Sequence, residues 1–165
     1  MIYTATITTS KNTALAALKH TVLNVTKGLV YKVEFYFPSG SAGLMGLAVF
    51  DGLFQLWPST VGEFFASDDE TISFDDMYLK EAAPYQLDIY TYNLDDTYDH
   101  QAQARVGLVS QDVYMARWLP TMGYDYFVEL LNKMAAEQAK MAAEQAAQLQ
   151  DTPYEWLVKQ LEVSE

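Results

Sequence analysis

Acidic side chains form the largest group of residues in this sequence that could do chemistry. Between Glu63 and Asp99 there are eleven carboxylates and one Lys, gathered mainly in segments 67–76 and 93–100. Carboxylates that converge from neighbouring loops could bind Ca²⁺, which takes oxygen ligands. The sequence contains no D-x-[DN]-x-[DN]-G-x5-E calcium loop, and Asp also favours turns because it bonds to the local backbone. We expect these residues mainly to form turns, and calcium binding at the two segments stays an open question.

A second chemistry open to carboxylates is the hydrolysis of a glycosidic bond, which needs two of them flanking that bond. Aromatic side chains that stack on sugars would add binding. No pair stands out among so many acids, and most Tyr and Phe side chains are expected to pack in the core. A carbohydrate-binding module or glycosidase is therefore the alternative function, and its aromatic candidates are Trp57, Tyr90, Tyr92 and Tyr98.

Other catalytic and cofactor signatures are missing from the sequence. Cysteine is absent, which excludes thiol nucleophiles and Cys-based metal sites. The two histidines, His20 and His100, do not have the spacing of metal ligands, and no G-x-S-x-G elbow supplies a nucleophile. Residues 40–46 are rich in glycine but lack the Lys of a phosphate-binding loop. We expect a non-enzymatic protein with no catalytic residue and no cofactor.

Net charge restricts the partners. At −12, the chain is poorly suited to binding nucleic acid or an anionic membrane surface, since both are negatively charged. The same charge could imitate phosphates, so a toxin-neutralising or DNA-mimic protein stays a third possibility. The N-terminus lacks the pattern of a secretory signal, and the longest apolar run, residues 42–50, is too short to cross a bilayer. We expect a soluble protein made in a cytoplasm.

The elements that must position these residues change in character near residue 120. Before it, β-branched and aromatic residues alternate between turn signals, which predicts a mainly β, antiparallel, jelly-roll-like sandwich over residues 1–119. Alternation places Leu29, Tyr31, Val33, Phe35 and Phe37 on one strand face, and Asp51-Gly52 predicts a hairpin. The strand order cannot be predicted. The expected strands are 2–9, 21–26, 29–37, 44–50, 53–57, 70–74, 77–80, 85–92 and 101–109.

Residues 120–165 are predicted to form a helical arm. A long helix is expected over about 124–150 and a short one over about 153–163, where Thr152, Pro153 and Glu155 make an N-terminal capping box. The heptad KMAAEQA occurs at 133–139 and again at 140–146, with too narrow an apolar stripe for a coiled coil. We interpret it as a rigid shaft, and whether it packs on itself or on a partner stays open. The partner-binding candidates of the arm are Phe127, Leu131, Met134, Met141, Tyr154, Trp156, Leu157 and Leu161.

Six short segments within about residues 20–110 carry a resemblance to a known group of proteins. They are Val25–Leu29 (VTKGL), Phe37–Gly40 (FPSG), Ala42–Leu44 (AGL), Val49–Gly52 (VFDG), Gln55–Ser59 (QLWPS) and Ser67–Glu70 (SDDE). Together they resemble small β-sandwich proteins encoded among the structural genes of tailed bacteriophages. The resemblance implies a virion component and transfers no site residue.

The resemblance implies the expected function, and the acidic, cysteine-free composition without a visible active site is compatible with it. The protein is expected to be a structural part of a virion, either a capsid cement or decoration protein or a head–tail accessory protein, assembled in the host cytoplasm. Its expected partners are the major capsid protein or another virion protein, together with neighbouring copies of itself in a homo-oligomer, and it is expected to bind them through its helical arm. Nucleic acid and membrane are not expected partners.

Overall fold

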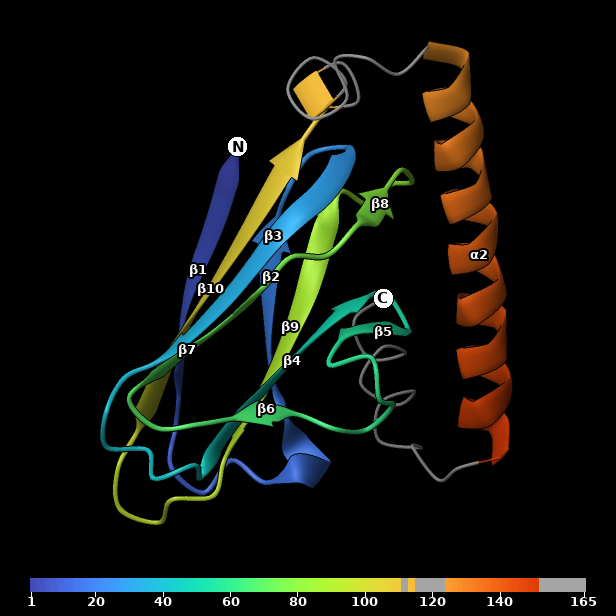
Figure 1. Ribbon diagram of the computed structural model, residues 1–165. Helices are drawn as coiled ribbons and strands as arrows, with labels where there is room; N and C mark the ends of the chain where they lie inside the picture. The colour runs from blue at the N-terminus through green and yellow to red at the C-terminus, as the bar shows by residue number, and fades with distance from the viewer. Residues whose placement is uncertain (111–112, 115–123, 152–165) are drawn as a thin grey trace.

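Two antiparallel sheets packed face to face form the body of the protein (Figure 1). The computed structural model describes residues 1–110, 113–114 and 124–151. The first sheet has the order β1 (Ile2–Thr9), β10 (His100–Val109), β3 (Gly28–Phe37) and β7 (Glu70–Phe74), and β8 (Tyr78–Lys80) also pairs with β3. The second has the order β2 (Lys19–Asn24), β9 (Gln86–Asn93), β4 (Met45–Asp51) and β5 (Phe54–Trp57), and β6 (Phe65–Ala66) also pairs with β4. A 3-10 turn, η1 (Leu15–Ala17), precedes β2.

The strand order is that of a jelly roll. Counting β5 with β6 as one strand, and β7 with β8 as another, gives eight strands. The first, third, sixth and eighth of these form one sheet, and the second, fourth, fifth and seventh form the other. This arrangement gives two Greek keys that share one core. The mainly β, jelly-roll-like sandwich expected from the sequence is therefore confirmed, as is the β4–β5 hairpin at Asp51-Gly52. The two-residue strand β6 was not predicted.

The core lies between the sheets and is built from alternate residues of both. Phe35 and Phe37 of β3 and Leu47 of β4 are fully buried there. Burying a side chain of this size stabilises the fold by about 1.5–3 kcal/mol. The same period of two places Leu87 and Ile89 of β9 in this core.

A β-bulge at Tyr31 changes which residues of β3 face that core. Tyr31 is one extra residue in the ladder to β10, between Val30 and Lys32. Val30 therefore joins the core, whereas Leu29 is buried outside it. The prediction that Leu29 and Tyr31 share the core face is wrong, because an extra residue shifts the side-chain alternation by one. Beyond the bulge the predicted face is confirmed, with three side chains in the core: Val33, Phe35 and Phe37.

A second, smaller cluster covers the outer face of the second sheet. Leu18, which follows η1, packs there with Ala48, Phe50 and Tyr90. The ring of Tyr90 contacts that of Phe50 edge-on, with centroids 5.2 Å apart. Strand β9 is consequently buried on both faces.

One long helix, α2 (Tyr124–Asp151), confirms the helix expected over about 124–150. It runs along the side of the sandwich where β8 and β5 lie, the edges of the first and second sheets (Figure 1). The part of the expected arm formed by α2 therefore lies against its own sandwich. The short helix expected over 153–163 falls outside the described residues.

Candidate interaction surfaces

Four loops meet at one end of the sandwich, and we call this surface the loop end (Figure 1). They join β1 to β2, β3 to β4, β6 to β7, and β9 to β10. Backbone hydrogen bonds connect them: Asn12 N–H donates to Asp95 O at 2.8 Å, and Leu94 N–H donates to Leu44 O at 2.9 Å. The loop end is therefore a single bonded unit.

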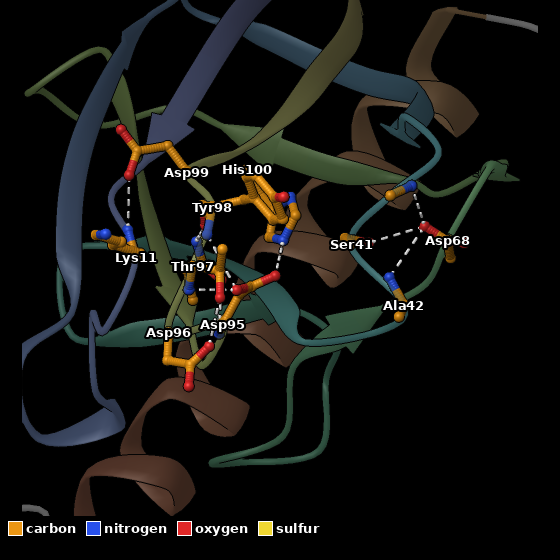
Figure 2. Close-up of polar contacts among 12 residues, drawn as sticks. Lys11, Ser41, Ala42, Asp68, Asp95, Asp96, Thr97, Tyr98, Asp99 and His100 are labelled. Carbon is orange, nitrogen blue, oxygen red and sulfur yellow. Dashed lines mark hydrogen bonds and ion pairs between the residues drawn. The ribbon is translucent and has the colours of Figure 1, made fainter.

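Asp68 organises one half of the loop end. Its Oδ1 accepts hydrogen bonds from Gly40 N–H at 2.7 Å, Ala42 N–H at 3.1 Å and the Ser41 hydroxyl at 3.3 Å (Figure 2). These donors favour the charged carboxylate, so they lower the pKa of Asp68, the Ala42 and Gly40 amides contributing most. Ala42 has a φ of +46°, a left-handed conformation. The carboxylate thus holds the β3–β4 turn in an otherwise unfavourable shape.

Asp95 organises the other half in the same way. Its Oδ1 accepts from Thr97 N–H at 2.6 Å and Tyr98 N–H at 3.0 Å, and its Oδ2 lies 2.8 Å from His100 Nε2 (Figure 2). The two amides, and then His100, lower the pKa of Asp95. In the same loop, Asp99 accepts from Lys11 N–H at 2.9 Å. The turn interpretation of segments 67–76 and 93–100 is therefore confirmed for Asp68 and Asp95.

The loop end also exposes large apolar side chains. Leu44 is 40% exposed, Leu94 is 50% exposed and Tyr98 is 67% exposed. Leu15, in η1 of the β1–β2 loop, is exposed as well. The surface is strongly acidic, since its loops carry five Asp and one Lys: Asp68, Asp69, Asp95, Asp96 and Asp99, with Lys11.

The residues considered for metal binding or catalysis make contacts within the fold. Among the described residues, no group of three or more His, Asp or Glu side chains is placed to hold a metal ion. His20 Nε2 lies 2.8 Å from Asp88 Oδ1, and the His20 ring stacks on Tyr90 at 4.8 Å. Burial and the Asp88 charge raise the pKa of Tyr90 to about 12. This group packs the outer face of the second sheet.

The four aromatic candidates for sugar stacking are not equivalent. Trp57 and Tyr90 are buried, so the prediction that they could stack on a sugar is wrong. The Trp57 indole N–H instead donates to Asp76 Oδ2 at 2.5 Å. Tyr92 is half-buried against Phe64. Only Tyr98 of the four is exposed.

Two of the predicted partner-binding residues on α2 are used within the chain. Phe127 and Leu131 are buried and line a cavity of 370 Å³ with Leu29 and Leu79. The Phe127 ring stacks on Tyr114 at 5.4 Å. The bulge in β3 explains this contact, because it turns Leu29 out of the core and towards the helix. Sequence periodicity identified the apolar residues of α2 but not the surface that they cover.

The other predicted residues of the arm have different surroundings. Met134 is half-buried, and Met141 is exposed beside a groove along β5. Tyr154, Trp156, Leu157 and Leu161 lie outside the described residues.

A glutamine pair that sequence reasoning missed attaches α2 to strand β5. Gln55 N–H donates to Gln145 Oε1 at 2.9 Å, and Gln145 Nε2 donates to Gln55 O at 3.0 Å. Gln145 thereby takes the place of a neighbouring strand at a sheet edge. The side chain of Gln55 is buried, and its Nε2 lies within hydrogen-bond distance of three backbone carbonyls: Pro58, Thr60 and Glu63.

A buried ion pair that was also missed links the two sheets. Lys80 Nζ of β8 donates to Asp51 Oδ1 of β4 at 2.5 Å, and the Tyr78 hydroxyl donates to Asp51 Oδ2 at 2.6 Å. Burial, and then the bond to Asp51, raises the pKa of Tyr78. One sequence signal was available: Lys80 is the only Lys among the eleven carboxylates between Glu63 and Asp99.

Several of the six short segments singled out in the sequence make structural contacts. Gln55 and Trp57 of QLWPS, Asp51 of VFDG and Asp68 of SDDE form the bonds described above.

No protein-family model matches the chain, and no curated protein matches it. No helix in the described part of the chain is long and apolar enough to span a membrane.

Proposed function

We propose that this protein is a non-enzymatic structural component of a bacteriophage virion, a capsid cement or decoration protein or a head–tail accessory protein. It binds a lattice formed by the major capsid protein or another virion protein. The loop end is the surface that makes this contact, and copies of the chain occupy the lattice as a homo-oligomer. Assembly takes place in the host cytoplasm.

The loop end is the observation that carries the proposal. Asp68 and Asp95 each bind two backbone amides, so both loops are held in shape before any partner arrives. A preorganised surface loses less conformational entropy on binding than a loose one. The exposed side chains that it presents (Leu44, Leu94 and Tyr98) supply apolar contact area of the kind found at the centre of protein interfaces.

The fold agrees with the proposal without deciding it. Jelly rolls build viral capsid proteins, and they also build lectins, so the fold by itself supports both the virion and the carbohydrate interpretation. The sugar interpretation depended on exposed aromatics, and Trp57 and Tyr90 are buried. The virion interpretation is therefore the better supported of the two.

Charge indicates the kind of partner surface. The loops that expose apolar side chains at the loop end also carry five Asp, and Lys11 is the one basic residue in them. A lattice surface that carries Lys or Arg around an apolar patch would be complementary in both charge and hydrophobicity. Binding should accordingly weaken as ionic strength rises.

Co-sedimentation with capsid particles of the phage that encodes the protein tests the proposal. Removing two apolar side chains with L94A/Y98A should weaken binding about tenfold or more, a loss of about 1.4 kcal/mol. The control is Y126A, which removes another exposed Tyr, 56% exposed against 67% for Tyr98, from α2 and should bind as the unmodified protein does. Equal binding by all three proteins would exclude the loop end as the contact.

A further inference from the structure

Strand β1 is an edge of the first sheet, on the side of the sandwich away from α2 (Figure 1). The other edge strands in the described part of the chain have features that discourage pairing with a further strand. Strand β2 carries Lys19 and His20, β7 carries Glu70, β5 is bonded to Gln145, and β6 and β8 have only two and three residues. The eight residues of β1, IYTATITT, include no charge and no Pro, and its pairing with β10 has no bulge.

Backbone hydrogen bonds show which groups of β1 face the open edge. Leu108 N–H donates to Met1 O at 2.8 Å, and the Met1 amino group donates to Leu108 O at 2.6 Å. Doubly bonded pairs of this kind alternate with unbonded pairs along an antiparallel ladder. The register therefore assigns the bonds to β10 to Met1, Tyr3, Ala5 and Ile7. The N–H and C=O groups of the residues between them point away from β10: Ile2, Thr4, Thr6 and Thr8.

One end of this row is occupied and the rest is open. Lys19 Nζ donates to Thr8 O. Within residues 1–110, 113–114 and 124–151, no hydrogen bond reaches the backbone N–H and C=O groups of Ile2, Thr4 and Thr6. Unpaired main-chain groups at a sheet edge supply the hydrogen bonds when a further strand is added.

The side chains along the open part of the row favour a second copy of the same strand. Ile2 is 72% exposed, and Thr4 and Thr6 are exposed as well. All three are β-branched and uncharged, and Thr opposite Thr is a favourable cross-strand pair. The charge opposite Thr4 on β10, Arg105, is paired with Glu34 at 3.6 Å. Since the chain carries a net charge of −12, an uncharged edge is where two copies repel each other least.

We propose that two copies of the chain pair along β1 in the antiparallel direction across a twofold axis, with Thr4 opposite Thr4 and Ile2 opposite Thr6 of the second copy. This register uses the open backbone groups and avoids the Thr8 carbonyl that Lys19 occupies. The contact is the same on both copies, as twofold symmetry requires, and it joins the two first sheets into one. It gives the homo-oligomer of the proposed function a contact surface, and in this respect it rests on that proposal. The two loop ends lie at opposite ends of the dimer, so this contact is separate from the lattice contact.

Sedimentation velocity of the full chain, over a range of concentrations and without particles, tests the pairing. The mass should rise from the 18.6 kDa of one chain to twice that value. T4K puts two like charges directly opposite each other and should weaken the dimer about tenfold or more. The matched control is T71K, the same substitution at an exposed position of β7 in the same sheet, which should leave the dimer unchanged. A single-chain mass at millimolar concentration, or equal weakening by T4K and T71K, would overturn the proposal. Neither result bears on co-sedimentation with particles.

Amide hydrogen exchange locates the contact. The Thr6 N–H points to the open edge, so it should be protected in the dimer and should exchange rapidly in T4K. The amides of Tyr3 and Ala5, which are bonded to β10, should stay protected in both proteins and so report that T4K is folded. A dimer in which the Thr6 amide exchanges rapidly would place the contact elsewhere and overturn pairing along β1.

Discussion

Gln145 of helix α2 and Gln55 of strand β5 form a reciprocal pair, in which each residue donates one hydrogen bond and accepts one. The Gln55 amide and carbonyl are both used, at 2.9 and 3.0 Å. Gln145 is the sixth residue of the second KMAAEQA repeat, and Gln138 is its equivalent in the first. The two identical heptads therefore have different roles, because only the second places its Gln beside Gln55.

Replacing Gln145 should destabilise the protein, and replacing Gln138 should not. Q145A leaves the Gln55 N–H and C=O without their partners at a largely buried position, at a cost of about 1–3 kcal/mol. Q138A, which leaves this pair intact, should change the free energy of unfolding by less than about 0.5 kcal/mol. Urea denaturation of both variants measures the difference. Equal losses would show that helix propensity, rather than the pair, sets the stability.

Acid should destabilise the protein through the two turn carboxylates. The folded-state pKa values of Asp68 and Asp95 lie below the ordinary value of 3.8, so the unfolded chain binds protons more readily. The stability that these two carboxylates contribute is present above pH 3.8, and it is lost as the pH falls through their lower folded-state pKa values. In D95N the unfolding midpoint should fall less steeply with decreasing pH between pH 5 and 2.

The control for this measurement is D69N, which changes an acid of the β6–β7 loop and leaves the bonds from Thr97 and Tyr98 to Asp95 in place. Its midpoint should follow the steep pH dependence of the unmodified protein. A pH dependence in D95N as steep as that of D69N would contradict the role assigned to Asp95.

Gly46 should tolerate no side chain, because the ring of Tyr92 lies across it. A Cβ built on Gly46 would be 2.2 Å from Tyr92 Cε1. G46A should therefore cost about 1–3 kcal/mol, the usual range for an overpacked site. In a Y92A background the same substitution should cost much less. A double-mutant cycle by thermal unfolding measures the coupling, and additive losses would argue against the clash.

Neutralising one partner of the buried Asp51–Lys80 ion pair should destabilise the protein more than neutralising both. K80M leaves the Asp51 carboxylate without its cation, at a cost of about 3 kcal/mol, the lower end of the range because Asp51 keeps some contact with solvent. The double variant D51N/K80M should lose less, since no uncompensated charge remains. Guanidinium unfolding compares the two, and a double variant less stable than K80M would contradict this account.

Much of the fold could be predicted because alternation and turn chemistry are local properties of the sequence. The Asp51-Gly52 hairpin, helix α2 and the strands other than β6 follow from such signals, although β2 begins and ends two residues earlier than the expected range of 21–26. The inward face of β3 was mistaken at Leu29 and Tyr31, because a bulge depends on pairing with β10, which a single strand does not reveal.

The candidate site was predicted less well, for a related reason. The acidic turns could be expected from composition, and Asp68 and Asp95 fill that role. The Gln55–Gln145 and Asp51–Lys80 pairs join residues far apart in the chain, so no local pattern marks them. The burial of Phe127 and Leu131 likewise depends on where the helix lies against the sandwich.

Saturation binding of the unmodified protein to assembled capsid particles tests the central claim most directly. Binding measured by co-sedimentation should saturate at a fixed whole-number ratio of copies to lattice repeat units, and it should weaken as salt increases. Absence of saturable binding to particles, together with binding on a glycan array, would contradict the account and favour the carbohydrate interpretation.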